Sequence, residues 1–150
     1  HTSTIRRIEG GMLSYHSDMD INTNPFELGL DKFIDLEKSF DFVGKDALIK
    51  IKKLGIQRKQ VGLIIECEKL KGPNTKKWGI FKNQQRIGQV TSAVYSPRLE
   101  QNIALAMVDI EYSDINTSLK IKIDDNLVDA KITVKPFFDP NKLIAKKSSI

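Results

Sequence analysis

The strongest constraint on the fold of this chain is a change in hydrophobic period near residue 57. Before that point apolar residues recur at helical spacing, whereas after it they alternate with polar residues along short segments. Alternation places successive side chains on opposite faces of a strand, and Gly, Pro, Asn and Asp separate the segments. Everything after residue 57 is therefore predicted to form an antiparallel module of five or six short strands, a small barrel or sandwich.

The alternating segments are residues 59–68, 86–95, 102–110, 118–123 and 127–138. The clearest pairing is a hairpin in which Leu119, Ile121 and Ile123 share a face with the apolar residues of 128–134. Lysines and Asp129 take the other face, and residues 124–126 supply the turn.

Two helices are expected before residue 57. In the first, which starts near Ser3, the residues Ile5, Ile8, Met12 and Tyr15 keep one face apolar. Its Gly-Gly pair at 10–11 predicts that another element or a ligand lies close to the backbone, because glycine inside a helix costs about 1 kcal/mol relative to alanine.

The second helix is predicted over residues 41–55, with Gly55 as its C-terminal cap. Between the two helices, Asn24-Pro25 marks a loop and residues 32–36 read as a short strand.

Composition narrows the class of protein. Of the 150 residues, 40% are hydrophobic and 29% are charged, as in globular domains. Apolar runs such as "IALAMV" are far shorter than the roughly 18 residues that a membrane helix needs. Cys67 is the only cysteine, which excludes an intramolecular disulfide and a Cys-based zinc site. We therefore expect a cytoplasmic protein. The opening "HTSTIRR" lacks methionine, and we expect this chain to be the later part of a longer polypeptide.

The chain carries a formal net charge of +5, with basic clusters at residues 50–59 and 74–86. The second cluster interleaves Trp78 and Phe81 with lysines, a pattern that single-stranded nucleic-acid platforms use. Nineteen acidic residues offset the basic ones, and lysine is ordinary on solvated faces and strand edges. We favour solvation over nucleic-acid binding.

Groups for catalysis are sparse. His16, Asp18 and Asp20 are close in sequence, but "HSDMD" lacks the i, i+4 histidine pair of a helical zinc site. A solvated turn is the favoured interpretation, and no metal site is predicted. Glu9 and Glu27 are a candidate carboxylate pair that sequence alone cannot bring together. These residues do not by themselves specify a reaction.

Six segments, in order, resemble one family. They are "RRIEGGMLSYHSDMD", "NPFELGL", "FVGKDAL", "RKQVGLIIE", "IGQVTSAVYSPRLEQNIALAMV" and "ITVKPFF". Over residues 4–138 they are similar to motifs of the folate-dependent aminomethyltransferases, whose type member is the glycine cleavage T-protein. Each segment is short, but their common order is specific.

The resemblance implies an α+β chain with three parts. Residues 1–57 would be the C-terminal part of the folate-binding domain, residues 58–138 a small antiparallel β-barrel of about six strands, and residues 139–150 a tail. The cofactor would be tetrahydrofolate. The full-length parent would move a one-carbon group from the nitrogen or sulfur of a small methylated or aminomethylated donor to this cofactor.

The resemblance does not identify the one-carbon donor or decide whether a carrier protein presents it. T-proteins take an aminomethyl group from the lipoyl arm of a carrier protein, which is therefore a candidate partner. "NPFE" at residues 24–27 leans toward the dimethylsulfoniopropionate demethylase and dimethylglycine or sarcosine relatives. The family's catalytic aspartate would lie upstream, so no catalytic residue is assigned here and this chain alone is expected to be inactive.

The resemblance also implies cofactor-binding residues. Met12 and Tyr15 fall where the family's helix faces the folate cavity, with ordinary core packing as the alternative. Arg7 and Glu9 are expected to position that helix through internal contacts, with direct folate contact as the alternative. An arginine that binds the carboxylate end of folate in T-proteins is replaced by Ser3, and Arg6 is the nearby substitute.

A function of another class remains an alternative. The chain would then be a non-catalytic β-barrel binding module whose basic surface takes nucleic acid or an acidic protein partner. This alternative predicts oligonucleotide affinity that falls steeply with salt and does not depend on folate.

Overall fold

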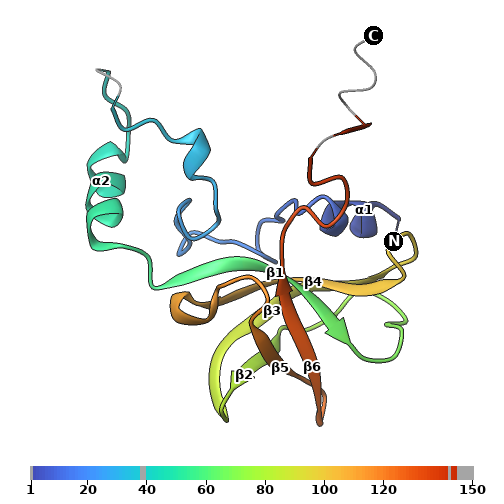
Figure 1. The fold of residues 1–150 in the computed structure, drawn as a ribbon. Coiled ribbons are helices and arrows are strands. Elements are labelled where there is room, and N and C mark those ends of the chain that lie inside the picture. Colours follow the sequence, from blue (N-terminus) through green and yellow to red (C-terminus); the bar gives the residue numbers. More distant parts are fainter. Residues whose placement is uncertain (1, 38–39, 142, 145–150) are drawn as a thin grey trace.

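The structure is a computed structural model that describes residues 2–37, 40–141 and 143–144. Two short α-helices precede six strands (Figure 1). The helices are α1 (Thr2–Glu9) and α2 (Lys45–Leu54), and the 3₁₀ turns are η1 (Asp31–Phe33) and η2 (Ile110–Tyr112). The strands are β1 (Arg58–Glu66), β2 (Trp78–Lys82), β3 (Gln85–Ser96), β4 (Gln101–Asp109), β5 (Ser118–Ile123) and β6 (Asn126–Thr133).

The strands close into an antiparallel barrel in the order β1-β4-β3-β2-β5-β6. The predicted α+β class and barrel of about six strands are confirmed. Inward-facing residues of all six strands fill the interior, including Leu63, Ile80, Val90 and Ile121. Strand β2 had not been predicted, because its "WGIFK" lies inside the basic cluster at residues 74–86.

Strand β4 is apolar on both of its faces for a physical reason. Ala104 and Ala106 point into the barrel, whereas Ile103 and Leu105 point outward and pack with Ile8 of α1. Figure 1 shows α1 lying against the side of the barrel formed by β3 and β4. The helix therefore covers a second, smaller apolar cluster on the outside of the barrel.

The predicted β5–β6 hairpin is present, but Asn126 is paired in β6 and not part of the turn. Leu119 pairs with Ala130 and Ile121 with Val128, and the pairing ends at Ile123 and Asn126 around the two-residue turn. Asp124 adopts a positive φ of 53°, which short hairpin turns demand and which Asp tolerates better than most residues. The prediction succeeded because the pairing is local.

Helix α1 ends at Glu9, so the prediction of one helix extending to Tyr15 was wrong. The N–H of Gly11 donates to Ile8 O at 2.9 Å and that of Met12 to Arg7 O at 2.9 Å. With Gly11 at φ +65°, these two bonds form a Schellman motif. The Gly-Gly pair is thus a helix stop. A Cβ at Gly11 would also lie 3.5 Å from Lys135 and Pro136, so another segment does lie close to this backbone.

The segment between the helices differs in part from expectation. Residues 31–33 form η1 where a strand was predicted. Helix α2 is present and ends as predicted at its C-cap Gly55, whose N–H donates to Ile51 O at 2.9 Å, but it begins at Lys45 and not at residue 41. No residue of α2 is buried, and Figure 1 shows this helix standing away from the barrel. Within the described ranges, no helix is both long and apolar enough to cross a bilayer.

Candidate functional site

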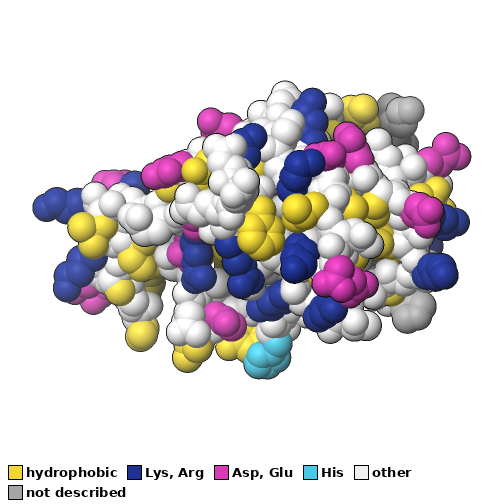
Figure 2. Space-filling model, turned by 90° about the horizontal axis from the view of Figure 1, so that it is seen from below, with side chains coloured by type: hydrophobic (Ala, Val, Ile, Leu, Met, Phe, Trp, Pro, Cys, Tyr) yellow, Lys and Arg dark blue, Asp and Glu magenta, His cyan; other side chains and the backbone are white. Residues whose placement is uncertain are grey.

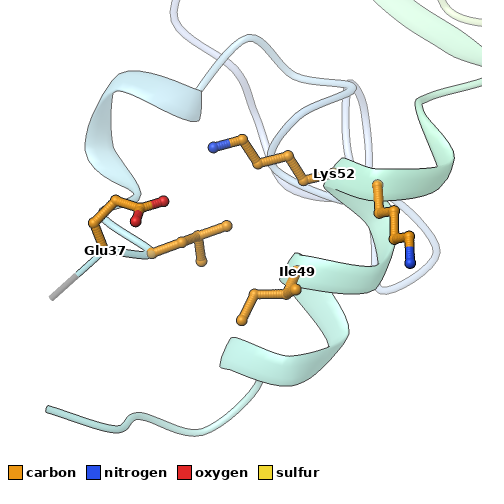
Figure 3. A pocket seen from close by; sticks show the side chains of 5 residues that line it. Glu37, Ile49 and Lys52 are labelled. Carbon is orange, nitrogen blue, oxygen red and sulfur yellow. The ribbon is translucent and has the colours of Figure 1, made fainter. Parts of the chain in front are cut away.

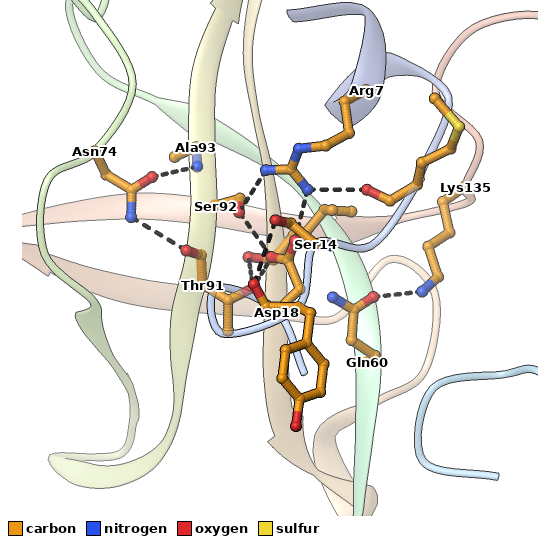
Figure 4. A network of polar contacts seen from close by, with 12 residues as sticks. Arg7, Ser14, Asp18, Gln60, Asn74, Thr91, Ser92, Ala93 and Lys135 are labelled. Carbon is orange, nitrogen blue, oxygen red and sulfur yellow. Dashed lines mark hydrogen bonds and ion pairs between the residues drawn. The ribbon is translucent and has the colours of Figure 1, made fainter. Parts of the chain in front are cut away.

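A buried carboxylate, that of Asp18, joins the turn after α1 to the barrel. Asp18 Oδ2 lies 2.6 Å from Arg7 Nη1 and accepts the N–H of Ser14 at 2.9 Å. Its Oδ1 accepts the hydroxyls of Thr91 at 2.6 Å and Ser92 at 2.7 Å. Figure 4 shows Arg7 and Ser92 converging on this carboxylate. Both oxygens are thus saturated, as a buried charge requires.

A β-bulge explains why two consecutive hydroxyls reach one carboxylate. In β3, Val90 pairs with Ala106 and Ser92 with Leu105, so Thr91 is left as an extra residue. Regular alternation would send the side chains of Thr91 and Ser92 to opposite faces, but a bulge breaks that alternation. Ser92 also accepts a hydrogen bond from Arg7 Nη2 at 2.8 Å, which closes the network.

Glu9, whose side chain is also buried, ties the end of α1 to two other segments through its carboxylate and its backbone carbonyl. Its Oε1 accepts the hydroxyl of Ser96, the last residue of β3, at 2.5 Å. The backbone carbonyl of Glu9 accepts the N–H groups of Phe137 and Phe138 at 2.9 and 3.1 Å. Glu9 therefore holds the helix, the barrel and the C-terminal segment together.

Lys135, which is half-buried, is the third ionisable group at this junction. Its ammonium donates to Gln60 Oε1 of β1, and burial lowers the pKa of Lys135 to about 8 against the opposing attraction of Asp18. Because the Oε1 atom takes this bond, the amide Nε2 of Gln60 points elsewhere and has no partner within the described structure. Figure 4 shows the lysine reaching the amide of Gln60.

The five predicted cofactor-binding residues fall into two groups. Arg7 and Glu9 make the expected internal contacts. Arg6, Met12 and Tyr15 are exposed, with exposed fractions of 58% for Met12 and 55% for Tyr15. Ordinary core packing is therefore wrong for Met12 and Tyr15 in this structure. Arg7 Nη1 donates to the carbonyl of Met12 at 2.9 Å, which anchors the exposed loop to the network.

The predicted solvated turn at residues 16–20 is only partly present. His16 and Asp20 are exposed, but Asp18 is buried, with 3% exposure, and carries the network. No group of three or more His, Cys, Asp or Glu side chains in the described part of the chain is placed to hold a metal ion. The candidate carboxylate pair does not form, because Glu9 bonds to Ser96 whereas Glu27 pairs with Arg58 at 3.0 Å.

The basic segment at residues 74–86 is not an aromatic platform. Trp78 is only 8% exposed and belongs to the barrel core, so its indole is inaccessible for stacking. Phe81 is half-buried on the outer face. Of the two aromatic residues that could stack on nucleic-acid bases, only Phe81 is therefore accessible.

A shallow hollow of about 370 Å³ lies away from the barrel. Leu36 and Glu37 line one side of it, and Ile49, Lys52 and Lys53 of α2 line the other. Figure 3 shows Glu37 and Lys52 on opposite sides of this hollow. It shares no lining residue with the network around Asp18.

Sequence reasoning missed the centre of the site. The local sequence predicts a turn at Asp18, because its hydroxyl partners lie 73 and 74 residues further along the chain. The only signal was the pair of motifs "YHSD" and "VTSA", which hold Asp18 and Thr91-Ser92. Nothing in their spacing indicates that they meet.

Comparison with known proteins identifies the barrel. Residues 58–139 match the family model of the glycine cleavage T-protein C-terminal barrel domain. The match spans β1 to the segment after β6, and so includes Thr91 and Ser92 but not Arg7 or Asp18.

Longer relatives extend the similarity into the N-terminal part. The chain is 38% identical over 133 residues to an aminomethyltransferase of Listeria monocytogenes serotype 4b, covering 88% of this chain and 36% of that protein. It is 39% identical over 142 residues to an aminomethyltransferase of Thermosynechococcus vestitus, covering 93% and 37%. The chain thus spans about a third of the length of these relatives.

The fold is also that of a solved structure. The glycine cleavage system aminomethyltransferase T from Bartonella henselae superposes with a TM-score of 0.82 at 23% identity. The superposition covers 91% of this chain and 38% of that one. At this identity the likeness concerns the fold alone.

Proposed function

This chain belongs to the glycine cleavage T-protein C-terminal barrel family, and from that premise we propose that it is the C-terminal part of a tetrahydrofolate-dependent aminomethyltransferase or methyltransferase. The parent enzyme moves a one-carbon group from a nitrogen or sulfur of its donor to tetrahydrofolate. Residues 1–57 complete the folate-binding domain, residues 58–138 form the barrel, and residues 139–150 are a tail. By itself this chain is inactive.

The observation that carries the proposal is that the hydrogen bonds around Asp18 fix the loop after α1 while leaving two of its side chains exposed. Arg7, Ser14 and Asp18 bind that loop to β3 through buried and partly buried hydrogen bonds. Met12 and Tyr15 stay exposed on the same loop. A fixed backbone with exposed apolar side chains is the arrangement of a pre-formed ligand-binding wall.

The exposed residues suit the chemistry of a folate. Met12 offers a thioether and Tyr15 a ring for a flat heterocycle, and the Arg6 guanidinium is a planar fork that matches a carboxylate. Among the residues that the structure describes, Arg6 forms no ion pair, so its charge is free to meet a ligand. Bound tetrahydrofolate would supply the N5 atom that receives the one-carbon group. Arg7 and Glu9 position the helix and do not contact the cofactor.

Two further features support a longer parent enzyme. Helix α2 has no buried residue, and Val43 and Leu54 are 104% and 81% exposed. Apolar side chains gathered on one segment indicate a surface that another part of a protein covers. The relatives are about three times as long as the part of them that this chain matches.

The donor, carrier and location belong to the same proposal. The donor is an N- or S-methylated or aminomethylated small molecule, and a lipoyl carrier protein presents it in the T-protein case. The parent works in the cytoplasm, in keeping with a single, half-buried cysteine at position 67.

A graft into a longer relative tests the proposal. The aligned 133-residue segment of the Listeria aminomethyltransferase is replaced by the matching segment of this chain. Transfer of the aminomethyl group to tetrahydrofolate is then measured with the host's carrier protein. We expect activity well above that of the host truncated before the segment.

A graft that unfolds cooperatively but transfers nothing would contradict the proposal. The control graft carries Lys71→Glu, a charge reversal at an exposed loop position of this chain. It should keep the activity of the unmodified graft.

A further inference from the structure

A second surface lies on the outer face of β2, β5 and β6. Ile80 and Ile121 point into the core. Because side chains alternate along a strand, Gly79 and Phe81 of β2 and Lys120 and Lys122 of β5 lie on the outer face. Residues of the β2–β3 turn and of β6 complete this surface, which lies at the lower end of the barrel in Figure 1.

The register of the strands builds a hollow there. Phe81 lies opposite Lys120, which lies opposite Asp129, and in the adjacent row Gly79 lies opposite Lys122. A Cβ at Gly79 would be 2.9 Å from Phe81 Cε2, so the ring lies over the glycine. The Phe81 ring therefore occupies the space that a side chain at position 79 would take.

The hollow is large and has apolar walls. Its volume is about 780 Å³, and Phe81 and Leu127 are among its lining residues. Leu127 is 59% exposed although it is a large apolar residue. A second hollow of about 250 Å³ adjoins it through Phe81 and Lys122.

More cationic than acidic side chains line the two hollows. The cationic residues are Lys76, Lys77, Lys82, Arg86, Lys120 and Lys122, and the acidic ones are Asp124, Asp125 and Asp129. Two of the carboxylates are already neutralised, because Lys76 pairs with Asp124 and Lys120 with Asp129, each at 2.7 Å. Within the described ranges Lys77 and Lys122 have no ion-pair partner. Figure 2 looks at this end of the molecule and shows hydrophobic side chains with charged groups around them.

We propose that this surface docks an acidic protein segment that places a bulky apolar side chain between Phe81 and Leu127. The apolar walls provide the anchor, and the unpaired lysines attract carboxylates and set the orientation of the segment. The surface lies apart from the Asp18 network and shares no residue with it. This inference therefore does not depend on the proposed enzymatic function.

Two other occupants fit less well. Nucleic acid would meet three carboxylates on the surface and a single accessible aromatic ring, since Trp78 is buried. A second copy packed symmetrically would bring two positively charged surfaces together.

Selection of peptides from a displayed random library against the full chain tests the proposal. We expect the enriched peptides to combine Asp or Glu residues with at least one large apolar residue. Fluorescence anisotropy of the best peptide is then measured with variants of the hollow. Lys122→Glu and Leu127→Ser should each weaken binding about tenfold, the change produced by about 1.4 kcal/mol.

The matched control is Lys71→Glu, which changes the net charge as Lys122→Glu does but lies outside both hollows. It should alter the affinity by less than about threefold, as expected for a remote surface charge. All three positions are exposed, and each variant's thermal unfolding is compared with that of the parent chain.

Three outcomes would overturn the proposal. The first is failure to enrich any acidic–apolar peptide. The second is binding that Leu127→Ser and Lys122→Glu leave unchanged. The third is tighter binding of a single-stranded oligo(dT) probe that Lys122→Glu abolishes, which would assign the surface to nucleic acid.

Discussion

Arg7 and Asp18, eleven positions apart, form an ion pair of 2.6 Å at the point where the helical part of the chain meets the barrel. The side chain of Asp18 is fully buried, whereas that of Arg7 keeps 22% of its exposure. The same arginine holds the carbonyl of Met12, and the same aspartate holds two hydroxyls of β3. The pair therefore couples the position of an exposed loop to the barrel.

Loss of the Asp18 charge should destabilise the chain. Asp18→Asn leaves Arg7 without its counter-charge in a partly buried site, and breaking such a pair costs about 3 kcal/mol. Urea unfolding should show this loss as a lower midpoint with an unchanged slope.

A double-mutant cycle separates the pair from its surroundings. Arg7→Met and Asp18→Asn together should cost clearly less than the sum of the single changes, because the double variant leaves no lone charge. Additive losses would show that the two residues do not interact across the junction.

Gly88 should tolerate no side chain. A Cβ at this position would lie 2.3 Å from Met107 O and 2.9 Å from Val108 Cα, both backbone atoms of the neighbouring strand. Gly88→Ala should therefore lower the free energy of unfolding by about 3 kcal/mol or prevent folding, as forced overpacking does. Gly72→Ala is the control, because a Cβ there meets nothing within 4 Å. Equal stability of the two variants would refute the close approach of β3 and β4.

Lys135 should make stability depend on pH in the alkaline range. Its pKa is lowered in the folded chain from 10.5 to about 8 by burial, with a smaller contribution from Lys59. Between these two values the unfolded chain binds more protons than the folded chain, so stability rises with pH. Compared with Lys135→Met, the parent chain should gain about 3 kcal/mol between pH 8 and 10.5.

The measurement is urea unfolding of both proteins at intervals across that pH range. The difference between them isolates Lys135 from other lysines and tyrosines that titrate in the same range. A difference that stays constant with pH would mean that the ammonium is not desolvated by folding.

The barrel could be predicted largely because its pattern is local. The β5–β6 hairpin needs only period-two alternation and a two-residue turn, and both are contiguous in the sequence. The end of α1 at Glu9 cannot be predicted from apolar spacing, because Met12 and Tyr15 continue the helical spacing of Ile5 and Ile8 beyond it. Apolar spacing does not reveal a Schellman motif.

The network could not be predicted, because its geometry depends on tertiary contacts. Asp18 meets Thr91 and Ser92 only after the barrel has closed, and the bulge that aligns the two hydroxyls is absent from any periodic pattern. Strand β2 could not be predicted for a different, local reason. Its buried Trp78 and Ile80 are flanked by lysines on the outside, so the segment resembles a basic cluster more than a strand.

We propose that the loop after α1 forms part of a tetrahydrofolate site in a longer enzyme. A calorimetric titration of tetrahydrofolate into the Listeria graft tests this directly. We expect one-to-one binding, which Met12→Ala and Tyr15→Ala weaken about tenfold, the effect of losing about 1.4 kcal/mol of contact. Both residues are exposed, so the unfolding temperature of the graft should hardly change. A folded graft that binds no tetrahydrofolate, or binds it equally well after both substitutions, would show that this loop is not part of a tetrahydrofolate site.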